Sequence, residues 1–210
     1  MDQISASERN RMQFERLIAG KAKVIVELGC GPNKTYPDAI GVDLLPMAGV
    51  DIVHNAEEGL TFMPDNSVDE ISSSHFLEHI VNFELLMKEI HRVLKPGGLH
   101  KAMVPHFSNP HYYSDFTHKR FFGLYTFDYF SKVQDQSLKR KVPDFYVDFH
   151  FIVVRRDLLF IRYFSMRNFF TYFLARPLFN TSDGMKELYE NKFCYTFPCK
   201  ELYFEMKAVK

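Results

Sequence analysis

The segment that decides the fold is residues 24–33, which read Val-Ile-Val-Glu-Leu-Gly-Cys-Gly-Pro-Asn. The apolar, β-branched run at 22–28 predicts a short buried parallel strand that ends in a Gly-x-Gly turn. Gly29 and Gly31 let the backbone come close to a ligand, because a Cβ at either position would collide with it. A dinucleotide fold would use a longer glycine spacing that opens a helix, whereas here Asn33 stands at the third glycine position behind Pro32, which disfavours a phosphate cradle. The segment predicts a cofactor loop, with a tight structural turn as the alternative.

Strands and helices follow one another on both sides of this segment. Ser5 and Glu8 have the spacing of a capping box, which predicts a leading helix that ends near Gly20. Short apolar runs predict strands at 40–45, 51–54, 68–73 and 99–104. Helically spaced apolar residues over 83–94 predict a helix, which Pro-Gly-Gly at 96–98 ends. This order predicts a Rossmann-like, doubly wound α/β fold with a mostly parallel sheet.

The pattern changes in the second half of the chain. Apolar residues alternate at 145–153 and again at 202–208, which predicts a C-terminal antiparallel strand pair that closes the sheet. Residues 158–195 between them are aromatic and basic and predict an aromatic helical lid. We expect one domain over residues 1–210, with a cofactor-binding core at 22–104 and acceptor-binding and lid elements at 105–195.

Composition narrows the class of protein. The chain has 46% hydrophobic and 25% charged residues, as soluble globular proteins do, and a formal net charge of zero, so we expect no nucleic-acid partner. Residues 27–90 hold twelve acidic side chains against two lysines, which predicts either two surfaces with different partners or two solvated faces. Three cysteines without a CxxC pair, a polar N-terminus and no long apolar run predict a cytoplasmic protein.

Polar residues lie at the ends of the second and third predicted strands. Asp43 ends the second strand, where a carboxylate can accept hydrogen bonds from both hydroxyls of a ribose. The alternative is a surface aspartate that starts a turn. Asn55 follows the third strand and is placed to contact the edge of an adenine. Because ligands of such sheets bind at the carboxyl ends of the strands, these residues predict a nucleoside site.

Together with Leu-Glu-His at 77–79 and Arg-Val-Leu-Lys-Pro-Gly-Gly at 92–98, these motifs resemble the class I S-adenosylmethionine-dependent methyltransferases, in particular a large bacterial subgroup with both elements. The resemblance covers residues 22–104 and implies S-adenosyl-L-methionine as the cofactor. It departs from the family at Asn33, and Pro32 and Pro37 imply a short or absent first helix. The resemblance implies that Glu27, Gly29 and Gly31 contact the methionine part of the cofactor and that Asp43 contacts the ribose. It implies further that Asn55 and Ala56 contact the adenine and that Ser74 and His75 lie at the methyl-donor end.

A group of histidines follows the fifth predicted strand. Methyl transfer from a sulfonium mainly requires alignment, but a hydroxyl acceptor also benefits from a base, and histidine suits that task near neutral pH. We therefore predict that His106, Asp115 or His118 contacts the acceptor or acts as the base. The alternative is an Asp115–His118 pair that only orders a helix. With His111 these side chains have the donor types of a metal site, but their spacing matches no established motif, so we predict no metal.

Residues 155–179 place five arginines among aromatic residues. Such a segment fits a helix in a lipid interface, which would suit a lipid-linked glycan acceptor, or a lid or dimerisation helix. We expect a methyltransferase acting on a hydroxyl or amine of a small-molecule or glycan acceptor, in the cytoplasm or peripheral at the inner membrane face. A non-catalytic S-adenosylmethionine-binding module is the alternative, and the glycine spacing argues against a nucleotide-dependent oxidoreductase. The sequence does not set the oligomeric state.

Overall fold

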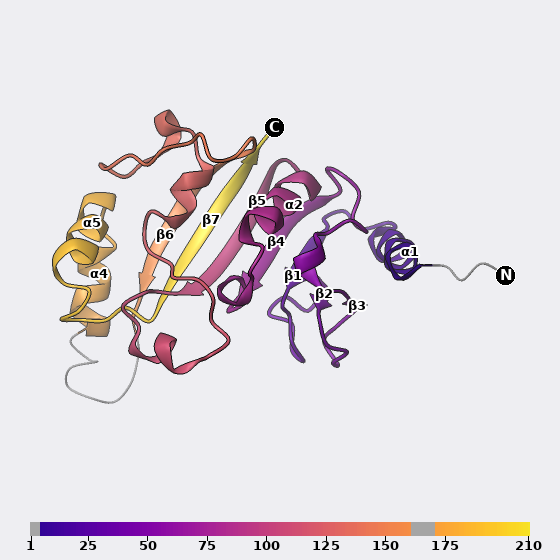
Figure 1. The fold of residues 1–210 in the computed structure, drawn as a ribbon, viewed down its shortest axis with the longest axis horizontal. Helices are drawn as coiled ribbons and strands as arrows, with labels where there is room; N and C mark the ends of the chain where they lie inside the picture. The colour runs from indigo at the N-terminus through magenta and orange to yellow at the C-terminus, as the bar shows by residue number, and fades with distance from the viewer. Residues whose placement is uncertain (1–4, 161–170) are drawn as a thin grey trace.

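The computed structural model describes residues 5–160 and 171–210, and its centre is a seven-stranded sheet of order β3-β2-β1-β4-β5-β7-β6 (Figure 1). β7 is antiparallel to both of its neighbours, and the remaining strand pairs are parallel. The predicted doubly wound sheet with a C-terminal antiparallel pair is confirmed. The strands are β1 Ile25–Leu28, β2 Ile40–Asp43, β3 Ile52–Val53, β4 Val68–Ser74, β5 Leu94–Pro105, β6 His150–Leu159 and β7 Glu201–Val209.

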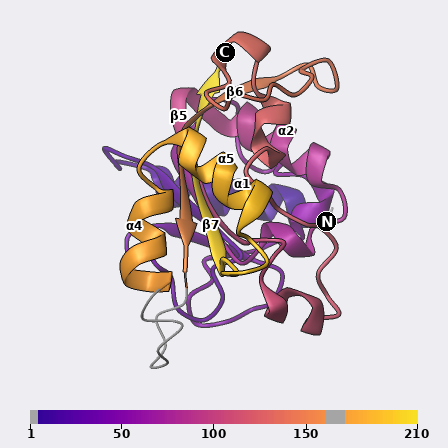
Figure 2. The same cartoon turned by 90° about the vertical axis from the view of Figure 1, so that its left-hand side faces the viewer.

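Helices pack around this sheet and at its two ends (Figures 1 and 2). α1 (Ala6–Ile18) begins with the predicted capping box, buries Phe14 and lies beside the β3 edge. α2 (Phe83–Val93) covers β5, whereas α4 (Arg176–Phe179) and α5 (Asp183–Lys192) lie at the β6 end. Short 3-10 or π segments are η1 Ala56–Glu58, η2 Leu77–His79, η3 Pro110–Ser114, η4 Thr126–Phe130, η5 Val133–Asp135 and η6 Thr171–Ala175.

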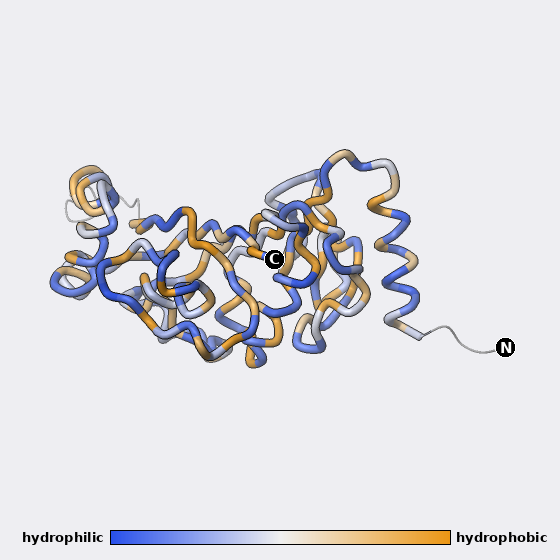
Figure 3. The backbone as a smooth tube through the Cα atoms, turned by 90° about the horizontal axis from the view of Figure 1, so that it is seen from above, coloured by the Kyte–Doolittle hydropathy of each residue, from blue (hydrophilic) through white to orange (hydrophobic). Residues whose placement is uncertain are grey.

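Burial follows the alternation of the strands. Val26 and Leu28 of β1 and Phe204 and Met206 of β7 are fully buried, and the strand register through β4 and β5 places all four on the same face of the sheet. Hydrophilic residues predominate along α1 at one end of the molecule (Figure 3). Within the described part of the chain, no helix combines the length and the apolar character that crossing a bilayer requires.

Two expectations about individual elements are corrected. The alternation from Phe145 onward does not mark the start of a strand, since β6 begins at His150 and Phe145 is 73% exposed. Residues 158 and 159 belong to β6 and not to a helix. A register shift between Val153 and Arg155 interrupts the alternation, so that Arg156 and Leu158 continue the buried face. Because of this irregularity, a strict alternation of apolar and polar residues does not identify the second half of β6 as a strand.

The connection between β1 and β2 contains no helix. The chain instead forms turns over residues 30–38, which agrees with the implied shortening of the first helix. β1 and β4 are the neighbours at which the strand order reverses. In sheets of this kind that reversal opens a crevice at the carboxyl ends of the strands, and the candidate site lies there.

Candidate functional site

A cleft of about 240 Å³ opens at the carboxyl ends of β1, β2 and β3. Four of the residues expected to contact a cofactor line it, namely Gly29, Asp43, Asn55 and Ala56. Glu27, Gly31, Ser74 and His75 are not among its lining residues. The full lining is Leu28, Gly29, Val42, Asp43, Leu44, His54, Asn55, Ala56, Glu57, Phe76, His79 and Ile80.

The glycine loop is shaped by a close approach of Phe76. Gly29 has φ +67°, and a Cβ on it would lie 2.5 Å from the Phe76 ring. Gly31 has φ +56° and open space where its Cβ would be. Gly29 is thus required by both the left-handed backbone and the ring, whereas at Gly31 the backbone conformation alone favours glycine. Phe76 forms a wall of the cleft that the sequence did not predict.

Glu27 stabilises the turn that replaces the first helix. Its carboxylate is buried and accepts hydrogen bonds from the backbone N–H of Thr35, at 2.9 and 3.0 Å, and of Tyr36, at 3.2 Å. These donors have no helical carbonyl to bond, because no helix forms between β1 and β2. The expected contact of Glu27 with a methionine moiety stays a prediction, and the position of its carboxylate does not favour it.

Asp43 joins the second strand to the glycine loop. One carboxylate oxygen accepts a hydrogen bond from Gly31 N–H at 3.0 Å, and the other accepts from Leu45 N–H at 3.1 Å. A carboxylate has about four acceptor positions, so this arrangement leaves capacity for the hydroxyls of a ribose. Asn55 is used locally, since its oxygen accepts from Glu57 N–H at 3.2 Å and caps η1. Its contact with an adenine stays a prediction.

His75 directly follows β4 and has a left-handed conformation with φ +50°. Its Nε2 lies 3.0 Å from Oε1 of Glu201 and its Nδ1 lies 3.2 Å from Oε1 of Glu78. The hydrogen bonds to Glu201 and then to Glu78 raise the pKa of His75 to about 9, against the effect of burial. His75 is therefore an imidazolium at neutral pH and ties the end of β4 to the start of β7. Ser74 precedes it as the last residue of β4.

His106 occupies a position inside the fold. It is fully buried, its Nδ1 accepts a hydrogen bond from Ser108 N–H at 3.1 Å, and its Nε2 lies 3.4 Å from Oε2 of Glu190. Both ring nitrogens are thus used by neighbouring groups, and His106 is not among the lining residues of the cleft. A role as general base would require this packing to open. The geometry does not support His106 as the base.

Asp115 and His118 lie close to His79, which follows β4. Nε2 of His118 lies 3.6 Å from Oδ2 of Asp115, and the His118 and His79 rings have centroids 5.0 Å apart. The Thr117 hydroxyl donates to Asp115 and lies 2.9 Å from Nδ1 of His79. The pKa of Asp115 is lowered, first by its side-chain hydrogen bond from Thr117 and then by the Thr117 backbone N–H. His111 is exposed and lies outside this group.

His79 and Glu78 are the site residues that sequence reasoning missed. Both belong to the Leu-Glu-His element, which carries the resemblance to the family but is not among the reacting groups that the sequence predicts. His79 lines the cleft, and Glu78 is fully buried beside it. The sequence signal that could identify these two residues is an acidic residue next to a histidine soon after a parallel strand, because that position faces the crevice.

The basic aromatic segment, residues 155–179, begins in strand β6 and ends in helical structure. Arg155 pairs with Asp157 at 2.7 Å, and buried Arg156 forms a bidentate pair with buried Asp128 at 2.8 and 2.9 Å. Two of the five arginines are thus paired within the fold, and Arg162 and Arg167 lie outside the described residues. Helical structure is present at 171–179, which agrees with part of the predicted lid.

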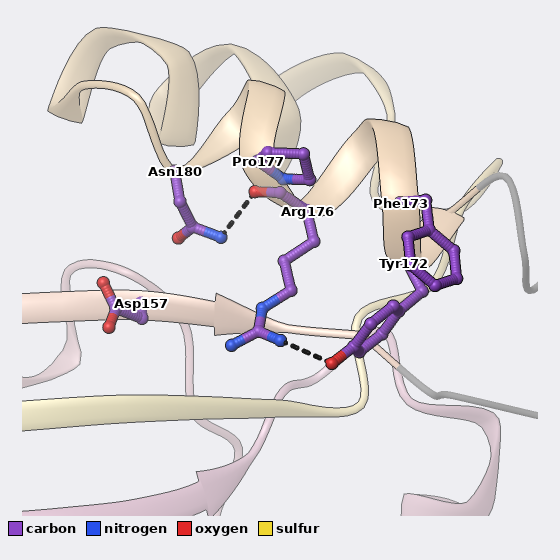
Figure 4. Close-up of a pocket in the computed structure, with 6 residues that line it drawn as sticks. All are labelled: Asp157, Tyr172, Phe173, Arg176, Pro177 and Asn180. Atoms are coloured by element: carbon purple, nitrogen blue, oxygen red, sulfur yellow. Dashed lines mark hydrogen bonds between the residues drawn. The ribbon is translucent and has the colours of Figure 1, made fainter.

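A second cavity of about 360 Å³ lies between this helical part and β6. Its wall includes Asp157, Arg176 and Asn180, and none of its lining residues is shared with the cleft at the glycine loop. Figure 4 shows Arg176 extending from the helix to donate to the Tyr172 hydroxyl at 3.0 Å, while the Asn180 amide donates to the Arg176 carbonyl at 2.8 Å. The cavity is separate from the predicted cofactor residues.

Comparisons with known proteins agree with this architecture. Residues 26–101 match the model of a family described as methyltransferase domain. No curated protein matches the chain. A SAM-dependent methyltransferase from Archaeoglobus fulgidus superposes with a TM-score of 0.54 at 16% identity, covering 97% of this chain and 94% of that one. The YcgJ protein from Bacillus subtilis gives 0.51 at 16%, covering 96% and 98%.

A phosphoethanolamine N-methyltransferase 2 from Haemonchus contortus, solved in complex with S-adenosyl-L-methionine, gives a TM-score of 0.50 at 16% identity. It covers 96% of this chain, which spans 52% of the other protein. At these identities the likeness shows the fold. The Rossmann-like fold found in methyltransferases is thereby established for this chain. The stretch that matches the family model, residues 26–101, contains all the residues that line the cleft.

Proposed function

We propose that this protein is an S-adenosyl-L-methionine-dependent methyltransferase. The observation that carries the proposal is the cleft at the reversal of strand order, where the Asp43 carboxylate lies against the Gly29–Gly31 turn. In a class I methyltransferase, the cofactor needs a carboxylate at the second strand and backbone without side chains at the first strand, and this cleft has both. The family match over residues 26–101 and the methyltransferase neighbours support the same cofactor.

The residues of the cleft fit the cofactor in character. Asp43 keeps acceptor capacity for the ribose hydroxyls, and Leu44 and Ile80 provide apolar surface for an adenine. The cleft volume of about 240 Å³ is below the roughly 300–1,000 Å³ of typical ligand pockets, so part of the ligand must extend beyond it. We expect Phe76 to turn away from Gly29 as the cofactor binds, since its ring covers the bare backbone there.

S-adenosyl-L-methionine supplies an activated methyl group on a sulfonium when it is bound. The contribution of the chain is to align an acceptor with that methyl and to exclude water. A hydroxyl or ammonium acceptor must also lose a proton. His79 lines the cleft and His118 lies beside it, so their ring nitrogens are the groups of this chain nearest to that task. Asp115 lies beside His118 and orients it.

We further propose that the methyl acceptor is a hydroxyl or amine of a molecule that has an exposed ring. Among such molecules, a small saccharide or a lipid-linked glycan is the leading class. Aromatic side chains are unusually exposed next to the Asp115–His118 pair, with Phe116 at 92% and Tyr113 at 64%. Tyr113 contacts Phe121, which is 61% exposed. Exposed apolar groups clustered beside a cleft mark ligand surfaces, and flat rings suit the C–H face of a sugar.

The test is a binding measurement followed by a transfer measurement. S-adenosyl-L-methionine should bind in calorimetry, and NAD and NADP should not shift the melting temperature. Methyl-labelled cofactor incubated with panels of saccharides, phenols and amines should label one class and release S-adenosylhomocysteine. Binding without labelling of any panel member would favour the non-catalytic module, and absence of cofactor binding would refute the proposal altogether.

A further inference from the structure

Glu78, His79 and His118 form a compact set of metal-binding side chains. One donor atom from each lies within 4.8 Å of the others. Glu78 and His79 belong to η2, directly after β4, whereas His118 follows η3 in the loop beyond β5. The group therefore depends on the fold and not on a sequence motif. His79 also lines the cleft that contains Gly29 and Asp43.

The hydrogen bonds around the two histidines select one tautomer in each. Nδ1 of His118 lies 3.0 Å from the carbonyl oxygen of Tyr112, which can only accept, so Nδ1 carries the proton. The Thr117 hydroxyl donates to Asp115 and therefore accepts from Nδ1 of His79. In a neutral ring this leaves the Nε2 lone pair of each histidine available. Such outer hydrogen bonds are the usual support of metal-binding histidines.

Glu78 supplies an unsatisfied anionic oxygen. The side chain is fully buried, and its Oε1 lies 3.2 Å from Nδ1 of His75. Its Oε2 is buried and has no hydrogen-bond partner within residues 5–160 and 171–210. A buried polar atom left without a partner destabilises the folded state, and more so when it is charged. A bound cation would remove that cost.

We propose that Glu78, His79 and His118 bind a divalent transition-metal ion of the zinc type beside the cofactor cleft. Two histidines and one glutamate, with a fourth position open, form a known arrangement of catalytic zinc. Bound through Oε2 of Glu78 and Nε2 of each histidine, the ion would satisfy the orphaned oxygen and the two free lone pairs at once. Because His79 also lines the cleft, the open position of the ion would be available to an oxygen or nitrogen of the acceptor. There the ion would favour loss of the acceptor's proton to solvent, and it would replace the two ring nitrogens in that task, since both would then be ligands.

A protonated His118 is the competing explanation. An imidazolium at this position would pair with Asp115, whose carboxylate lies 3.6 Å away, and would need no ion. That arrangement leaves Oε2 of Glu78 without a partner, which is why the metal explains more of the geometry. The two explanations differ in metal content. Binding of the ion is independent of the proposed function, whereas the assignment of the open position to the acceptor rests on it.

The experiment uses the full chain, stripped with a chelator and titrated with Zn²⁺ and with Co²⁺. We expect one ion per chain by elemental analysis, and a visible Co²⁺ spectrum of four-coordinate type. His118→Ala and His79→Ala should each weaken Zn²⁺ binding at least tenfold, because loss of a ligand exceeds the 10–100-fold typical of lost outer hydrogen bonds. His111→Ala is the matched control, since His111 is an exposed histidine of the same loop outside the set, and it should bind as the wild type does.

Glu78→Gln tests the buried carboxylate, with circular dichroism and cofactor affinity as checks of folding. If Glu78→Gln does not fold, the two histidine variants decide the matter. Absence of stoichiometric Zn²⁺, or equal affinity in wild type, His79→Ala and His118→Ala, would overturn the metal site. Zn²⁺ binding without cofactor binding would keep the site and refute the proposed function. Full methyl transfer by the stripped protein would overturn the assignment of the open position to the acceptor.

Discussion

Replacement of Asp43 by alanine removes the group on which the cofactor assignment depends. The carboxylate accepts hydrogen bonds from Gly31 and Leu45 and keeps acceptor positions for a ribose. A hydrogen bond to a charged group contributes about 1.5–3 kcal/mol net, so two ribose hydroxyls contribute about 3 kcal/mol at the lower limit. Since 1.4 kcal/mol corresponds to a tenfold change, Asp43→Ala should weaken S-adenosyl-L-methionine binding about 100-fold, or tenfold where water replaces part of the contact.

Calorimetry measures this loss, and Asp51→Ala provides the matched control. The Asp51 carboxylate likewise accepts a backbone hydrogen bond, from Gly41 at 2.7 Å, and pairs with Lys34 at 2.8 Å, but it does not line the cleft. Asp51→Ala should lower the melting temperature and leave cofactor affinity unchanged. Wild-type affinity in Asp43→Ala would refute the ribose contact. An equal loss in both variants would show that Asp43 acts only by holding the glycine turn.

Two further predictions concern acid stability and membranes. The pKa of Glu89 is lowered by hydrogen bonds from Arg92, against burial, so its stabilisation is present above the ordinary pKa of 4.5 and is lost as pH falls through the lowered value. Glu89→Gln should therefore cost about 1–3 kcal/mol in urea unfolding at pH 7 and much less at pH 3, and a pH-independent difference would contradict this. In the segment 155–179, Leu174 and Leu178 are more than half exposed. We expect the protein to float with anionic liposomes but not with neutral ones, and we expect the Leu174→Ser/Leu178→Ser double variant to lose this co-flotation. Wild-type protein that never floats would remove the membrane contact.

The cofactor half of the site follows from local signals. Strand ends are marked by the change from apolar to polar residues, and a carboxyl edge brings those ends together, so Gly29, Asp43, Asn55 and Ala56 are predictable as neighbours. The wall formed by Phe76 is not, since it requires the left-handed turn at His75 that directs the next residue over Gly29. Histidine adopts that conformation more often than most non-glycine residues, but too rarely for the sequence alone to predict it at His75.

The acceptor half depends on contacts between distant segments. The sequence predicts reacting groups after the fifth strand, but His106 turns into the interior, whereas His118 meets His79 from the preceding crossover. Such a meeting is decided by the path of the loop over residues 106–118, for which the sequence shows no period. The second half of β6 cannot be predicted for a related reason, because one register shift near Arg155 moves the buried positions out of phase with the alternation before it.

The place of β7 inside the sheet has a consequence for synthesis of the chain. Among the strands of the described residues, β6 pairs with β7 alone, which lies about forty residues further along and is inserted between β5 and β6. While the ribosome is still adding residues 160–209, the nascent β6 has no strand to pair with and presents Phe151 and Val153 unprotected. Such an unpaired apolar strand is prone to aggregate, so a stall in translation over that interval should be more harmful than one after residue 209.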